Sequence, residues 1–200
     1  MKKQFLTALF SIVFLIAFAG GYEIGDKATD FRLMNIDGKM VSMSDFKDAK
    51  GIIVIFTCNH CPYSKLYEDR IIELDKKYKK KGFPVIAINP NDSIRQPADS
   101  YSKMIVRADE KGFTFPYLLD ADQSIARTYG ASRTPHVFIL EKAKSDFIVK
   151  YIGAIDDNSQ SAKDVDETFA SDAIDALLAG KSVDPTFTKA VGCTIKWAEK

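Results

Sequence analysis

The chain has 200 residues, of which 46% are apolar and 12% aromatic, and its formal net charge is +1. This length and apolar content suit one domain with a single well-filled core. The 28 basic and 27 acidic residues nearly balance, so the composition provides no basic field of the kind that binds nucleic acid. With three cysteines, the chain is also not a small protein stapled by many disulfides.

The first 19 residues have the pattern of an export signal. Lys2 and Lys3 precede an uncharged run from Phe5 to Ala19, which ends in the small-x-small sequence Ala17-Phe18-Ala19. A run of about 15 apolar residues is shorter than the ~20 that a membrane-spanning helix needs, so we predict a cleaved signal peptide at residues 1–19 rather than a retained anchor. The mature protein is then expected to be periplasmic or extracellular, with no stable membrane span.

Two β signals follow the predicted signal peptide. Residues 22–50 alternate apolar and polar side chains around Asp37-Gly38, a dipeptide suited to a tight turn, which predicts an N-terminal β-hairpin. Residues 51–57 (GIIVIFT) are an almost wholly apolar, β-branched run. Such a run is typical of a strand that is covered on both faces in a parallel or mixed sheet.

From Cys58 onward the spacing of apolar residues becomes helical. They recur on one helical face, at Tyr67, Ile71, Leu74 and Tyr78. Pro62 suits the first turn of this helix, and the sequence Lys79-Lys80-Lys81-Gly82 is a typical helix end. The pair Cys58 and Cys61 is therefore expected at a strand-to-helix junction, at the start of the helix.

The rest of the chain alternates strand and helix signals. Apolar runs predict strands at residues 83–89, 115–119, 137–140 and 147–152. Helical spacing predicts helices over residues 99–111, 122–129 and about 165–178, with Gly180 as a stop. This order predicts an α/β fold with a central mixed sheet flanked by helices. We expect one domain over residues 22–180 and a C-terminal tail over residues 181–200 that packs on it through its apolar residues.

The Cys58-Asn59-His60-Cys61 sequence is the candidate active site. Free backbone N–H groups and the helix dipole at the start of a helix stabilise a thiolate, which is the attacking species in disulfide exchange. We therefore predict Cys58 as the nucleophile and Cys61 as the resolving thiol. His60, when protonated, and Asn59 are the candidate tuning residues, although His60 could equally be a solvent-facing loop histidine.

Two other uses of the cysteine pair are weighed against the redox use. A zinc site needs two further ligands, and the chain offers only His60 and His136, so no metal is expected. A structural disulfide remains open, because an oxidising compartment alone could join the pair.

Three segments together resemble the thioredoxin-like redoxins: IIVIFTCNHCPY, then Arg133-Thr134-Pro135 before HVFIL, and the opening GDKATDFRLMNIDGKMVSMSDFKDAKG. The chain is most similar to the alkyl hydroperoxide reductase/thiol-specific antioxidant group, which is peroxiredoxin-like, and to the TlpA/ResA-type exported reductases. The resemblance covers roughly Gly25 to Gly153 and implies a thioredoxin-like fold. It also implies that Pro135 is a cis-proline facing the cysteines and that Thr134 presents backbone groups to a bound substrate. An ordinary trans-proline is the alternative.

The chain departs from these families at several positions. Ile52 stands where thioredoxins have a buried acid, and Thr57 replaces the tryptophan that often precedes the first cysteine. Ile55 and Gly51 stand where peroxiredoxins have a Thr or Ser and a Pro, so the peroxidase signature is missing. The direction of electron flow therefore stays open.

Two residues outside the motif are also candidates. Cys193 is a candidate third thiol, which could resolve Cys58, pair with another chain, or simply be a small buried residue. His136 could line the substrate groove, or bind copper with the thiols as in Sco-type proteins, although those have a CxxxC spacing.

We predict an exported thiol-disulfide oxidoreductase that requires no bound cofactor. Its expected partners are protein or small-molecule thiols and disulfides and a redox partner protein. The alternatives are a peroxiredoxin-like thiol peroxidase with antioxidant activity, and a non-catalytic binding or copper-assembly protein whose disulfide is structural.

Overall fold

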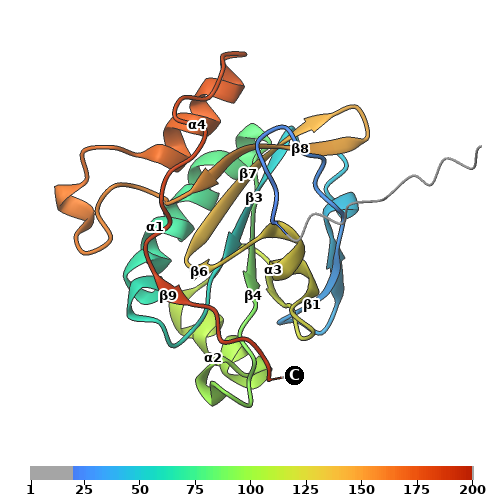
Figure 1. Cartoon of the computed structure of the whole chain (residues 1–200), viewed down its shortest axis with the longest axis vertical. Coiled ribbons are helices and arrows are strands. Elements are labelled where there is room, and N and C mark those ends of the chain that lie inside the picture. The colour runs from blue at the N-terminus through green and yellow to red at the C-terminus, as the bar shows by residue number, and fades with distance from the viewer. Residues whose placement is uncertain (1–19, 200) are drawn as a thin grey trace, which may run out of the picture.

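A computed structural model gives the structure of residues 20–199 (Figure 1). The predicted signal peptide at residues 1–19 lies outside the described residues. Within residues 20–199, no helix is both long and apolar enough to cross a membrane.

The described chain forms a mixed seven-stranded sheet in the order β2-β1-β5-β4-β3-β7-β8. Its strands are β1 (Arg32–Asn35), β2 (Met40–Ser42), β3 (Gly51–Phe56), β4 (Val85–Asn89), β5 (Tyr117–Leu119), β7 (His136–Ala143) and β8 (Asp146–Gly153). β3, β4 and β5 run parallel to one another, whereas β7 is antiparallel to β3, and β8 to β7. The wholly buried β3 lies between β4 and β7, as its unbroken apolar sequence predicts.

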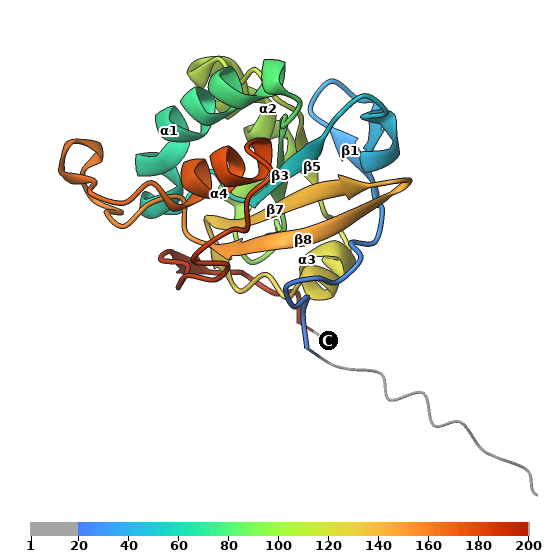
Figure 2. The same cartoon turned by 90° about the horizontal axis from the view of Figure 1, so that it is seen from above.

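Helices cover both faces of this sheet, so the predicted α/β architecture is confirmed (Figure 2). One face carries α1 (Pro62–Tyr78), α2 (Tyr101–Lys111) and α4 (Phe169–Leu178), and the other carries α3 (Ser124–Tyr129). Alternate side chains of β3 enter the two cores, because successive residues of a strand point to opposite faces. The 3-10 helices are η1 (Met43–Asp45), η2 (Lys79–Lys81), η3 (Pro97–Asp99) and η4 (Ala162–Asp164).

The predicted N-terminal hairpin is present. β1 and β2 pair antiparallel, and Gly38 in the turn has a φ of 79°, which favours glycine. The hairpin continues the main sheet through antiparallel pairing of β1 with β5, a long-range contact that the local pattern does not indicate.

The first helix begins later than the sequence suggests. α1 starts at Pro62, with Cys61 as its N-cap, so Cys58 precedes the helix by four residues rather than lying in its first turn. Pro62 explains this start, because its missing N–H and fixed φ suit the first helical position. The next helix begins at Tyr101 rather than residue 99, because η3 occupies the preceding residues.

The C-terminal tail lies against the domain and adds two short pairings. Thr186 and Thr188 exchange backbone hydrogen bonds of 3.0 Å with Ile152 in β8. Further along, β9 (Cys193–Thr194) pairs antiparallel with β6 (Arg133–Thr134) in a separate two-stranded sheet (Figure 1). The tail therefore crosses the edge of the domain where the carboxyl end of β3 leads into α1.

A buried ion pair joins α1 to α2. Arg107 donates hydrogen bonds from Nε and a second nitrogen to the two carboxylate oxygens of Glu68, the first at 2.7 Å. The Glu68 side chain is 4% exposed and that of Arg107 is 22% exposed. Truncating Arg107 would leave a buried carboxylate with only Lys111, at 3.5 Å, as a cationic partner.

We expect Arg107→Ala to lower the free energy of unfolding by about 3 kcal/mol, since removing one partner of a buried pair leaves a charge without its counter-ion. Urea unfolding of the oxidised protein measures this. Glu110→Ala is the matched control, because Glu110 is an exposed partner of the same arginine, and its loss should cost about 0.5 kcal/mol or less. Equal effects of the two substitutions would contradict the prediction.

Candidate active site

The two cysteines of the motif meet at Thr134, the residue before Pro135. Sγ of Cys58 forms a hydrogen bond of 3.2 Å with Oγ1 of Thr134, and Sγ of Cys61 lies 3.3 Å from the backbone oxygen of Thr134. The Thr134–Pro135 peptide bond is cis, as the family resemblance implied. Residues 76 positions apart in the sequence thus form one site at the end of β3.

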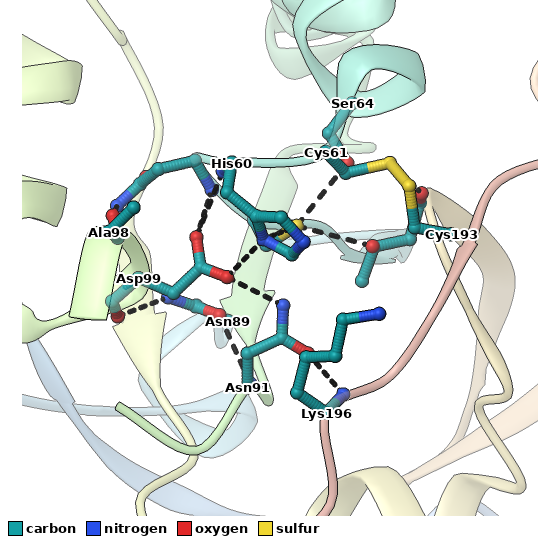
Figure 3. A network of polar contacts seen from close by, with 12 residues as sticks. His60, Cys61, Ser64, Asn89, Asn91, Ala98, Asp99, Cys193 and Lys196 are labelled. Atoms are coloured by element: carbon teal, nitrogen blue, oxygen red, sulfur yellow. Dashed lines mark hydrogen bonds and ion pairs between the residues drawn. A yellow bond between two sulfur atoms is a disulfide. The ribbon is translucent and has the colours of Figure 1, made fainter. Parts of the chain in front are cut away.

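The disulfide in this structure joins Cys61 to Cys193, and Cys58 is the free thiol (Figure 3). The antiparallel pairing of β9 with β6 places Cys193 opposite Thr134 and so beside Cys61. The roles expected for the third thiol did not include this bond, which joins Cys193 to Cys61 within the chain.

Asp99 is the central residue of the site, although no local sequence pattern selects it. Its carboxylate is fully buried and accepts hydrogen bonds from the backbone N–H groups of Asn59 and His60, at 2.8 and 3.0 Å. It also accepts from Nδ2 of Asn91 at 2.7 Å and forms an ion-pair contact with Nδ1 of His60 (Figure 3). Local periodicity suggested only that Asp99 begins a helix, because its partners lie up to 40 residues away in the chain.

His60 and Asn59 have different surroundings. Nδ1 of His60 lies 3.5 Å from Sγ of Cys58 as well as against Asp99, so the ring connects the thiol to the carboxylate. The Asn59 side chain instead donates to the Ala98 oxygen at 3.0 Å and accepts from the Tyr117 hydroxyl at 2.9 Å. Asn59 therefore anchors the turn between the cysteines, while Nδ1 of His60 contacts both Cys58 and Asp99.

The environment of Cys58 disfavours its thiolate. Burial raises the pKa of the Cys58 thiol, and the negative charge of Asp99 raises it further. Hydrogen bonds from Thr134, the Cys61 backbone and Ser64, whose Oγ is 3.8 Å away, act in the opposite direction without reversing the shift. The sequence-based expectation of a helix-stabilised Cys58 thiolate is wrong for this state, because the residue is 2% exposed and precedes the helix.

Within residues 20–199, one set of side chains is compact enough to consider as a metal site. Cys58, His60 and Asp99 offer ligand atoms that all lie within 4.8 Å of one another. The Asp99 carboxylate is already occupied by donors from three residues, so this set acts as a hydrogen-bond network in the structure.

His136 is not part of that set. It packs on Phe138 with ring centroids 4.8 Å apart, and burial lowers the pKa of its imidazole to about 4. It lines a different cavity of about 590 Å³ together with Tyr22 and Phe187. The copper alternative required His136 to join the thiols, whereas the compact ligand set found among the described residues contains Cys58, His60 and Asp99.

Residues 24–157 match the AhpC/TSA family model. The chain belongs to the AhpC/TSA family. This family member is 29% identical over 157 residues to the thiol-disulfide oxidoreductase ResA of Bacillus cereus, covering 71% of this chain and 85% of that protein. The expected relationship to the redoxins is therefore confirmed.

Solved structures show the same fold. A hypothetical protein from Sinorhizobium meliloti superposes with a TM-score of 0.83 at 33% identity, covering 90% of this AhpC/TSA chain and 98% of the other. A putative thiol:disulfide interchange protein DsbE from Chlorobium tepidum gives a TM-score of 0.53 at 24% identity over 63% of this chain and 82% of that one. The fold is thioredoxin-like, as the resemblance implied.

The raised pKa of Cys58 generates a prediction for its reactivity. In the oxidised protein, alkylation of Cys58 by iodoacetamide should be slow at neutral pH and accelerate as pH rises through the raised pKa, because only the thiolate reacts. Asp99→Asn should move this profile to lower pH, since it removes one cause of the shift. Mass spectrometry of the alkylated peptide across a pH series measures both profiles.

Asp109→Asn is the control, because it removes one negative charge from an exposed position of α2. Its profile should match that of the parent protein. An Asp99→Asn profile that is unchanged, or displaced to higher pH, would show that the carboxylate does not oppose thiolate formation.

Proposed function

We propose that the chain is an exported thiol-disulfide oxidoreductase that exchanges disulfides through Cys58 and Cys61. The observation that carries the proposal is the meeting of the two cysteine sulfurs at Thr134, beside the His60–Asp99 pair. The ResA relatives, which are named thiol-disulfide oxidoreductases, support the same reaction class.

In the proposed reaction, the Cys58 thiol gives its proton to the His60–Asp99 pair: Nδ1 of His60, which contacts both the sulfur and the carboxylate, takes up this proton as its own N–H proton passes to Asp99. The Cys58 thiolate attacks one sulfur of a substrate disulfide, and the other substrate sulfur leaves as a thiolate and takes up a proton. Cys61 then attacks Sγ of Cys58, which releases the second substrate thiol and forms the Cys58–Cys61 disulfide. Two electrons pass from the enzyme dithiol to the substrate, and no bound cofactor takes part.

The remaining roles follow from position. Thr134 and Pro135 are proposed to align the substrate backbone, since the backbone of Thr134 pairs with an extended segment, strand β9, in this structure. His60 is proposed to tune Cys58, and Asn59 to hold the turn on which both cysteines lie. The proposed partners are thiols and disulfides of proteins or small molecules, together with a redox partner protein.

The proposal includes the division of the chain. Residues 1–19 would be the signal peptide, residues 22–180 the redoxin domain and residues 181–200 the tail. Export to the periplasm or beyond rests on the N-terminal pattern Lys2, Lys3 and the apolar run to Ala19. An oxidising compartment suits a chain whose redox group is a disulfide.

The peroxidase alternative receives less support from the site. The raised pKa of Cys58 does not separate the two reactions, because both use a Cys58 thiolate. The difference is that Ile55 and Gly51 replace the residues of the peroxidase signature. Rapid loss of the Cys58 thiol with one equivalent of peroxide would reverse this preference.

We expect the mature protein to reduce the disulfides of insulin with dithiothreitol as electron donor, and Cys58→Ser to lower this turnover to background because the nucleophile is lost. Cys61→Ser should instead accumulate a mixed disulfide between Cys58 and the substrate, visible on a non-reducing gel. Far-ultraviolet circular dichroism confirms that each variant is folded. Full turnover by Cys58→Ser would refute the proposed role.

The reduction potential of the Cys58–Cys61 pair distinguishes a redox-active disulfide from a structural one. In Cys193→Ser, where only Cys58 and Cys61 can pair within the chain, equilibration with glutathione or dithiothreitol should give a value between about −270 and −120 mV, the range of known exchangers. A value below about −300 mV would mark a structural disulfide and favour the binding-protein alternative.

A further inference from the structure

We infer that Cys193 is a third redox thiol, which takes over the disulfide from Cys58 and leaves the oxidised enzyme with a Cys61–Cys193 bond and a free Cys58. This inference deepens the proposed function and rests on it for the formation of the Cys58–Cys61 disulfide during turnover. The structure contains the product of the transfer, with Cys58 as the free thiol.

The transfer is an exchange without net oxidation. The Cys193 thiolate attacks Sγ of Cys61, so that the Cys61–Cys193 bond forms while the Cys58–Cys61 bond breaks. The electron pair of the broken bond stays on Sγ of Cys58, which takes up a proton equivalent to the one that Cys193 lost. One disulfide and one thiol are present before and after the step, so no further oxidant is needed.

The tail is held on both sides of Cys193 by contacts that do not involve sulfur. Before it, Thr188 donates its backbone N–H to Ile152 at 3.0 Å. After it, the backbone N–H of Lys196 donates to Oδ1 of Asn91 at 2.8 Å (Figure 3). The Lys196 oxygen also accepts from Gln123 at 2.9 Å. These anchors raise the local concentration of the Cys193 thiol at Cys61, because the tail loses little further freedom when the bond forms.

Gly192 allows this approach. A Cβ at position 192 would lie 2.3 Å from the backbone oxygen of Thr134, which is the atom that Sγ of Cys61 also contacts. The tail backbone thus runs directly against Thr134, and a glycine precedes the cysteine at the point of closest contact.

Burial makes the product a closed form of the enzyme. With the tail in place, Cys58 is 2% exposed and Cys61 is 0% exposed, so neither sulfur is open to a large disulfide substrate. β9 also pairs with the backbone of Thr134, which is where the proposed function places the substrate chain. Transfer to Cys193 therefore leaves the disulfide buried beneath the tail. When Cys58 attacks Cys61 in the reverse step, the Cys61–Cys193 bond breaks and the tail is released.

The first test identifies the free thiol of the oxidised protein. The mature chain is oxidised with one equivalent of diamide, quenched in acid, unfolded, alkylated with N-ethylmaleimide and mapped by mass spectrometry. We expect the label on Cys58. A label mainly on Cys193, which means that the bond stays at Cys58–Cys61, would overturn the inference.

Gly192→Ala tests the route without changing any sulfur. The added methyl group forces the tail away from Thr134, so the label should move from Cys58 to Cys193. Trp197→Ala, which removes the stacking of Arg127 on the indole at 4.3 Å, should move part of the label in the same direction. Gly20→Ala is the control, because its added methyl group meets nothing within 4 Å. Labelling of Cys58 alone in both tail variants would contradict the tail's role.

The order of events is measured by quenching the reduced protein at intervals after diamide is added. The Cys58–Cys61 disulfide should appear first and then convert to Cys61–Cys193. Cys58→Ser should form the Cys61–Cys193 bond at about one-tenth of the parent rate or below, because the buried Cys61 is inaccessible to diamide. Equal rates in the two proteins would overturn the transfer. The disulfide maps need no substrate, so they test the transfer separately from the proposed function. If the disulfide does not move to Cys193 but the protein reduces insulin, only the transfer is refuted. If the disulfide moves but the protein does not reduce insulin, only the proposed function is refuted.

Discussion

The buried carboxylate of Asp99 is the group on which the site depends. It accepts the backbone N–H groups of Asn59 and His60 and so fixes the turn that carries both motif cysteines. Through Asn91 it is linked to the backbone of Lys196 in the tail. One negative charge thus connects the end of β3, the loop after β4 and the C-terminal segment, and it also disfavours a second negative charge on Cys58.

The sheet explains why these segments meet. β3 and β4 are parallel neighbours, so their carboxyl ends lie at the same edge, where Cys58 follows one strand and Asn91 follows the other. β7 runs antiparallel beside β3 and therefore begins at this edge, which brings the preceding Thr134 and Pro135 to the cysteines. The chemistry lies on loops, but three buried strands determine where those loops begin.

The sequence predicts most of this framework, because strands and helices leave local periodic patterns. The apolar run of β3, the turn at Gly38 and the helical spacing of apolar residues in α1 all follow from nearby residues. The cis bond before Pro135 came from resemblance rather than from any local pattern. Asp99 was missed because its partners are distant in the chain, and no local pattern marks a carboxylate that will be buried.

The electrostatics of Cys58 could not be predicted for the same reason. The motif suggests a helix terminus and a low thiol pKa, whereas burial and the Asp99 charge, both tertiary effects, raise that pKa. The partner of Cys193 was likewise left open, since it depends on the register that places this residue opposite Thr134. Long-range packing determines what the local motif can do.

The sequence separation of the Cys61–Cys193 bond has a consequence for the unfolded chain. The bond joins residues 132 positions apart and turns most of the domain into one covalent ring, whereas a Cys58–Cys61 bond would close only a four-residue ring. Loop-closure entropy makes the larger ring more stabilising by about 3 kcal/mol. The form with the Cys61–Cys193 bond would therefore melt at a higher temperature than the form with the Cys58–Cys61 bond, although each contains one disulfide. The oxidised enzyme would be hardest to unfold while its disulfide is held by Cys193.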